Sequence, residues 1–134
     1  MDKEPQGLMH ELNNFEVTQF NNLKLEKIII CEKPKTKAPV IVFLKIESNN
    51  WHEYFLDAGL GFWHHCDEID TDDDYNYIDK TNEYGLLNKV IYKIWCESHE
   101  NNSQIIIEFK SREKLILRTV KPKIFDSESE LVKL

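Results

Sequence analysis

Apolar and polar residues alternate along two stretches of the chain, with the period of two that is typical of β-strands. The first stretch begins near Leu23 and the second near Lys89, and polar turns divide each stretch into three. Six strands are therefore predicted, and short connections make each set of three an antiparallel meander. The predicted strands cover residues 23–31, 40–46, 51–58, 89–96, 105–109 and 114–120.

Helical signals are confined to the two ends of the chain. Pro5 suits the first turn of a helix, and the apolar residues after it recur at helical spacing, which predicts a short helix over 4–15. Ser127, with Glu130 three residues later, resembles a capping box and predicts a last short helix that ends at Leu134. The predicted fold class is α+β, mainly antiparallel β, with about six strands in two similar three-stranded meanders and short N- and C-terminal helices.

The two meanders resemble each other in sequence. Aligning Cys31 with Cys96, a shift of 65, also aligns the β-branched runs of the second and fifth predicted strands. This indicates either an internal duplication of residues 23–58 and 88–120, joined by an acidic segment at 62–80, or chance similarity between Ile-rich strands. In both cases the 134 residues suit a single domain.

The net charge adds a feature that periodicity does not show. The chain has 17 Lys and Arg against 24 Asp and Glu, for a formal net charge of -7. Seven acids and no bases lie between Asp67 and Asp79, so the rest of the chain is formally neutral, with 17 of each sign. We call residues 67–79 the acidic block. It is either a solvated loop that aids solubility or a docking surface for a cation or a basic partner.

Composition excludes several broad classes. With 41% hydrophobic and 11% aromatic residues the chain is expected to fold, and its acidic balance counts against direct binding of nucleic acid. Neither a signal peptide nor a run of the ~20 apolar residues that a membrane span needs is present, so a cytoplasmic location is expected. Cys31, Cys66 and Cys96 are odd in number and widely spaced, which does not suit a disulfide framework.

Candidate metal ligands gather over His64–Glu68, just before and within the start of the acidic block. Adjacent residues of an extended chain point to opposite faces, so these side chains cannot all reach one ion. An EF-hand alignment starting at Asp70 puts Tyr75 where Gly is needed and Thr81 where a bidentate Glu is needed. No cofactor and no specific metal site are predicted, and weak Ca²⁺ binding by the clustered carboxylates stays open.

Catalytic motifs are missing from the sequence. It contains no G-x-S-x-G, no glycine-rich phosphate loop and no H-E-x-x-H. Cys66 follows His65 directly, whereas the partners of a catalytic dyad usually lie far apart in sequence. We therefore expect a protein that is not an enzyme.

Aromatic residues interleaved with acids favour a binding role. Aromatic side chains dominate interface hot spots, and a surrounding negative field speeds association with a positive partner. The alternative for Trp63 is that it continues a core strand. The predicted partner-binding residues are Trp63, Asp67, Glu68, Asp70, Asp72, Asp73, Asp74, Tyr75, Tyr77 and Asp79.

The short chain without a leader, its Ile/Lys/Asn-rich composition and the run YFLDAGLGFW at 54–63 leading into acids together carry a resemblance. The sequence resembles the small cytoplasmic immunity proteins of bacterial contact-dependent inhibition and other polymorphic toxin systems. That resemblance implies a protein that binds and blocks a cognate toxin domain, often a nuclease. An acidic patch would then mimic phosphate in a basic cleft.

Two other functions remain as alternatives. One is a metal-binding module or metal-dependent enzyme that uses His64–Glu68. The other is a scaffold or assembly domain that pairs through an exposed sheet edge.

Overall fold

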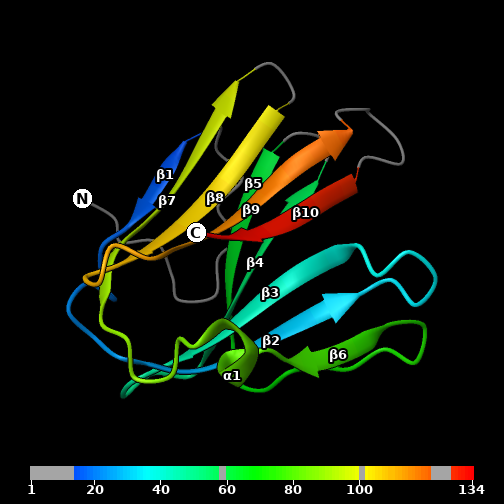
Figure 1. The fold of residues 1–134 in the computed structure, drawn as a ribbon. Helices are drawn as coiled ribbons and strands as arrows, with labels where there is room; N and C mark the ends of the chain where they lie inside the picture. The colour runs from blue at the N-terminus through cyan, green and yellow to red at the C-terminus, as the bar shows by residue number, and fades with distance from the viewer. Residues whose placement is uncertain (1–13, 58–59, 100–101, 122–127) are drawn as a thin grey trace, which may run out of the picture.

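The computed structural model describes residues 14–57, 60–99, 102–121 and 128–134, which form two five-stranded antiparallel sheets packed on each other (Figure 1). Sheet A has the order β5-β4-β3-β2-β6. Its strands are β2 (Leu25–Glu32), β3 (Pro39–Ile46), β4 (Trp51–Asp57), β5 (Leu60–Cys66) and β6 (Asn76–Asp79). Sheet B has the order β1-β7-β8-β9-β10. Its strands are β1 (Phe15–Val17), β7 (Ile91–His99), β8 (Asn102–Phe109), β9 (Lys114–Lys121) and β10 (Glu128–Lys133).

The predicted α+β class is wrong, because the described residues form ten strands and a single four-residue helix, α1 (Thr81–Tyr84). All six predicted strand regions are strands, but β1, β5, β6 and β10 were not foreseen. The predicted C-terminal helix is instead β10. Of the predicted N-terminal helix over 4–15, residues 4–13 lie outside the described residues, and Phe15 begins β1.

Pairing with a free sheet edge explains why β10 is a strand. Its residues donate to and accept from β9 along the register Glu130–Arg118 to Lys133–Leu115. Without β10, the edge of β9 would expose a row of unpaired backbone groups. This tertiary gain outweighs the local preference of a capping box, which stabilises a helix by only about 1 kcal/mol.

The two sheets are built with corresponding registers. Ile28 pairs with Leu44 in sheet A, as Ile94 pairs with Ile107 in sheet B. The offset between the sheets is therefore 66 residues from β2 to β7 and 63 from β3 to β8, in place of the single shift of 65 suggested by the sequence. The internal duplication itself stays a prediction.

Each half of the chain contributes an edge strand to the sheet that the other half forms. β1 precedes the meander of sheet A but pairs with β7 of sheet B. β6 precedes the meander of sheet B but pairs with β2 of sheet A. The sheets are thus linked by exchanged strands as well as by their packing.

The hydrophobic core lies between the sheets. It is formed by the inward side chains of both meanders, together with Phe20 and Leu86 from the connections that lead into β2 and β7. Tyr54 is the largest of the fully buried side chains. No helix among the described residues has the length and apolar character needed to cross a membrane.

The sheets approach each other much more closely at β5 than at β10. A Cβ atom added at Gly61 of β5 would lie 2.4 Å from Sγ of Cys96 and 3.2 Å from the ring of Phe15. Trp63 of β5 pairs with Tyr54, and Leu131 of β10 pairs with Leu117 at the corresponding place in sheet B. Ser129, two residues before Leu131, therefore corresponds to Gly61, two residues before Trp63. Ser129 lines an open cleft instead. The sandwich is therefore closed along β5 and open along β10.

This difference predicts opposite responses to the same side chain at the two positions. Gly61→Val should lower the free energy of unfolding by about 1–3 kcal/mol, because the buried Cys96 and the half-buried Phe15 leave no room for it. Ser129→Val should change it by no more than about 0.5 kcal/mol, as at a surface position. Urea denaturation of both variants measures the difference, and equal losses would contradict the closed and open arrangement.

Candidate partner-binding site

Residues 67–75 of the acidic block join the two edge strands of sheet A, and residues 76–79 of the block form β6. The connection from β5 to β6 consists of residues 67–75, and these strands are separated by β4, β3 and β2. Four steps between neighbouring strands come to about 19 Å, whereas nine extended residues span at most about 30 Å. Residues 67–75 are therefore long enough to cross the sheet, with about 10 Å of extended length to spare.

The block is anchored on the outer face of sheet A, away from the core. Strand alternation places Phe43 and Cys31 on that face, yet their exposed fractions are only 2% and 1%. Tyr77 pairs with Cys31 across the strands, and its ring lies 6.2 Å from that of Phe43. The Tyr77 hydroxyl also accepts a hydrogen bond of 2.9 Å from the backbone N–H of Asp72. These contacts form a small second apolar cluster that holds the acidic block against the sheet.

Hydrogen bonds fix the C-terminal end of the block to β2. The hydroxyl of Thr81 donates to Oδ1 of Asp79 at 2.6 Å and accepts from the backbone N–H of Ile28 at 2.9 Å. The backbone N–H of Thr81 donates to the same carboxylate at 2.9 Å. These bonds to Thr81 lower the pKa of Asp79. Lys27 adds an ion pair at 4.0 Å.

The other anchors are a turn within the block and two contacts at its start. Oδ1 of Asp72 accepts from the backbone N–H of Asp74 at 2.9 Å, which closes an Asx turn. Oδ1 of Asp67 accepts from Asn50 at 3.2 Å and lies 3.6 Å from Nε2 of His65. The block is thus tied to the sheet at both ends and near its middle.

The predicted site residues fall into three groups. The seven acids are all exposed, whereas Tyr75 and Tyr77 are half-buried. Trp63 is on the inner face of β5 and packs against the core. Within the part of the chain that the structure describes, four acids have side chains with no hydrogen bond or ion pair: Glu68, Asp70, Asp73 and Asp74.

Trp63 belongs to an aromatic cluster that the sequence did not reveal. Its indole N–H donates a 3.0 Å hydrogen bond to Nδ1 of His52, and the two rings stack at 5.9 Å. Phe20 meets His52 edge-on at 4.5 Å. His52 is 1% exposed, and its burial, together with nearby His65 and His64, lowers its pKa to about 4.

The candidate metal ligands over His64–Glu68 point in different directions. His64 is on the outer face of β5 and lies 3.3 Å from Oε1 of Glu53, while His65 is beside His52, with ring centroids 5.2 Å apart. Burial raises the pKa of Cys66 to about 11. Among the described residues no three His, Cys, Asp or Glu side chains are grouped closely enough to hold a metal ion.

Several residues that shape this site carried only weak sequence signals. Phe43 and Lys45 lie on the same face of β3. A large apolar residue on a face that also carries a lysine is the signal that could have suggested a covered outer face. Thr81 and His52 had no such signal: Asp79 is a local partner of Thr81, but the bond from Thr81 to Ile28 and the bond from Trp63 to His52 join different strands or elements. Their roles follow only from the fold.

Comparison with known proteins leaves the fold and site to be interpreted from their own geometry. No protein-family model, curated protein sequence or solved structure matches this chain.

Removing the Thr81 hydroxyl tests how the block is anchored. Thr81→Ala should lower the free energy of unfolding by about 1–3 kcal/mol, since it leaves the buried N–H of Ile28 without an acceptor. Thr81→Ser keeps the hydroxyl and should retain most of the stability. Urea denaturation gives both values, and amide hydrogen exchange over residues 72–79 should accelerate in the alanine variant only. Equal behaviour of the two variants would show that the hydroxyl is not the anchor.

Burial of neutral His52 makes stability depend on pH. The folded pKa of about 4 lies below the ordinary value of 6.5, so the unfolded chain binds the proton first as the pH falls. The contribution of His52 is present above pH 6.5 and is lost as the pH falls towards 4, by up to ~3 kcal/mol.

His52→Gln removes this titration while retaining a hydrogen-bond acceptor for Trp63. Its free energy of unfolding should therefore fall less steeply between pH 6.5 and 4 than that of the natural protein. Parallel slopes for the two proteins, measured by denaturation at several pH values, would contradict the assignment.

Proposed function

We propose that this protein is a non-enzymatic immunity or inhibitor protein that binds and neutralises a basic toxin domain through the acidic block. The partner class is a protein with a positively charged surface, and a nuclease cleft is the preferred example. Nucleases bind phosphate, so exposed carboxylates can occupy the same basic cleft. A cytoplasmic site of action is part of the proposal.

The observation that carries the proposal is a set of exposed carboxylates on an anchored backbone. Glu68, Asp70, Asp73 and Asp74 lack counter-ions within the described part of the chain, while Tyr77 and Thr81 hold the neighbouring backbone. A fixed array of like charges costs less conformational entropy on binding than a flexible tail. It also steers a cationic partner during encounter.

Two acids are suited to a charge-reversal experiment. The side chains of Asp73 and Asp74 make no hydrogen bond or ion pair within the described residues, so Asp73→Lys/Asp74→Lys should leave the fold intact. The control Asp57→Lys/Glu97→Lys makes the same change in net charge at exposed positions outside the block. Both variants are tested for binding to the product of the gene immediately upstream, at several salt concentrations.

The block variant should lose at least about tenfold in affinity, mainly through slower association, and its salt dependence should become shallower. The control should bind as the natural protein does, apart from a small effect of net charge. Co-expression with the upstream gene should protect cells only when the block is intact. Unchanged affinity and salt dependence in the block variant would contradict the assignment of the site.

A further inference from the structure

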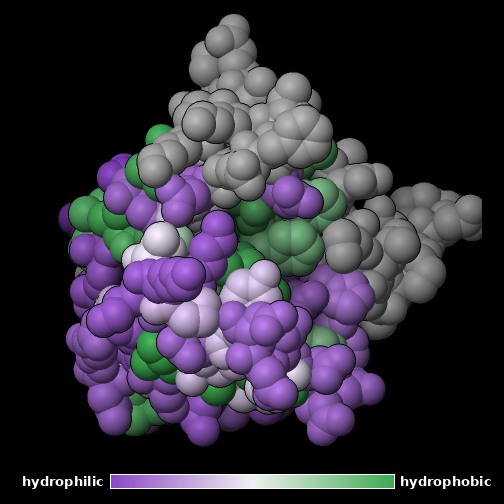
Figure 2. Space-filling view, turned by 90° about the vertical axis from the view of Figure 1, so that its right-hand side faces the viewer, coloured by the Kyte–Doolittle hydropathy of each residue, from purple (hydrophilic) through white to green (hydrophobic). Residues whose placement is uncertain are grey.

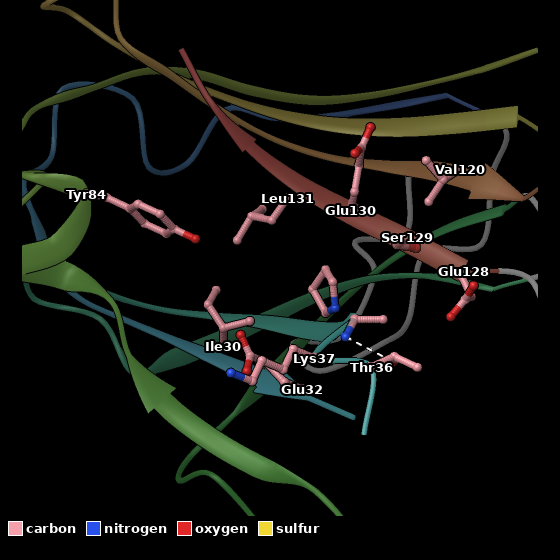
Figure 3. A pocket seen from close by; sticks show the side chains of 12 residues that line it. Ile30, Glu32, Thr36, Lys37, Tyr84, Val120, Glu128, Ser129, Glu130 and Leu131 are labelled. Carbon is pink, nitrogen blue, oxygen red and sulfur yellow. Dashed lines mark hydrogen bonds between the residues drawn. The ribbon is translucent and has the colours of Figure 1, made fainter. Parts of the chain in front are cut away.

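A cleft opens between the two sheets on the side where β10 stands away from β2. Its volume is about 530 Å³, within the range of small-molecule sites. The elements that line it, β10 and the β2–β3 hairpin, lie at the right of Figure 1, and Figure 2 shows apolar residues among hydrophilic ones on that side. The walls come from β2, β3, α1, β9 and β10 (Figure 3).

Glu32, the last residue of β2, lines this cleft and is 9% exposed. Within the described part of the chain its side chain makes no hydrogen bond and no ion pair. Its carboxylate oxygens are not among the fully buried polar atoms that lack a partner, so they face the open space of the cleft while the rest of the side chain is covered. Charged groups in so enclosed a position are normally paired in proteins. The corresponding residue in β7 is Ser98, which hydrogen-bonds to Ser103 at 2.6 Å. The glutamate is therefore not required by the strand pairing itself.

Two lysines lie near Glu32, but neither forms an ion pair with it. Lys37 lines the same cleft, but its ammonium group is exposed and forms no ion pair with Glu32. Lys80 forms an ion pair with Glu83 at 3.2 Å and interacts with Glu32 only at longer range. Tyr84 presents its ring and hydroxyl to the cleft (Figure 3). Glu128 and Glu130 add negative charge at the β10 wall, where Glu130 is bonded to Arg118.

The remaining wall is apolar and fits the stem of a ligand. Ile30 lies beside Glu32 at the floor, and Leu131 faces it from β10 (Figure 3). Pro39 and Val120 continue this surface towards the hairpin end. A cationic head next to Glu32 and an aliphatic stem along these side chains would satisfy both parts of the cleft.

We propose that this cleft binds an alkylguanidinium or alkylammonium group, with Glu32 as the counter-ion and Ile30 and Leu131 against the aliphatic stem. The Tyr84 hydroxyl accepts a further hydrogen bond from the cation. The proposal does not rest on the acidic block, which lies on the opposite face of sheet A. Such a group could belong to a free small amine or to an arginine side chain of a protein.

Titration followed by ¹H–¹⁵N NMR and calorimetry tests the proposal on the full chain. The probes are agmatine for a free cation, acetyl-Gly-Arg-Gly-amide for a peptide side chain, and N-butylurea as a neutral isostere. Agmatine or the peptide should shift the amides of Ile30, Ser129 and Leu131, and N-butylurea should not. The tighter of the two cationic probes identifies the source, and binding of neither overturns the proposal.

Three variants separate the role of Glu32 from general electrostatics. Glu32→Gln should weaken the cationic probe at least about tenfold, whereas Glu16→Gln, at an exposed acid of β1 on the opposite edge of sheet B from β10, should leave binding unchanged. Lys37→Ala should tighten binding because it removes a competing positive charge.

The stability of Glu32→Gln gives a second readout that does not depend on any probe. Its melting temperature should stay the same or rise by a few degrees, because a neutral amide replaces an enclosed charge that has no hydrogen bond or ion pair in the described part of the chain. A fall in melting temperature would show that Lys37 or another internal cation already pairs with Glu32, which would overturn the proposal. Equal binding by Glu32→Gln and the natural protein would also overturn it.

Discussion

Four backbone hydrogen bonds between residues 22–25 and 88–91 hold the two halves of the chain together, and the rest of the architecture depends on them. Asn22 donates to Ile91 and Ile91 donates to Leu23, while Leu25 donates to Lys89 and Asn88 donates to Leu25, all at 2.8–2.9 Å. The bonds correspond in pairs when each residue of the first half is matched with the residue 66 positions later: Asn22 donates to Ile91 as Asn88 donates to Leu25. Asn22 and Asn88 both have positive φ, at 73° and 64°, a conformation that asparagine tolerates better than most residues. Each meander therefore begins from the same turn, with the two turns bonded to each other.

This junction explains why the edge strands are exchanged. The turn that leads into β2 is bonded to the start of β7. The residues before this turn therefore lie beside β7, and they pair with it as β1. The same geometry places β6 beside β2. The acidic block is the consequence, because β5 ends at one edge of sheet A and β6 must form the other. A crossover of this kind has to lie on the outer face, where Phe43 and Tyr77 supply the apolar contact that fixes it.

Periodicity predicted the parts of the fold that depend on local sequence. The strands at 40–46 and 51–58 correspond closely to β3 and β4, because each has a β-branched or aromatic run bounded by polar turns. The C-terminal strand was missed because its partner, the edge of β9, is a tertiary feature. β1 has three residues and β6 has four, too few for a period to appear. The acidic residues of the candidate site were evident from charge alone, but the inward position of Trp63 depends on the register between β4 and β5.

The two sheets also carry different residues at corresponding positions, and these differences coincide with the closed and the open end of the sandwich. At one end of the sandwich, Gly61 allows β5 to contact Cys96, and the serine pair at Ser98 satisfies its own hydrogen bonds. At the other end, Ser129 and Glu32 occupy the corresponding positions and the sheets stand apart. Closing the second end in the same way would bury more apolar surface and remove an unpaired charge, both of which stabilise a fold. The closed end therefore shows how closely the two sheets can pack, and the open end departs from it at Ser129 and Glu32, where a charged group faces a cleft. Departures of this kind, which lower stability without serving the strand pairing, are expected at sites that bind ligands.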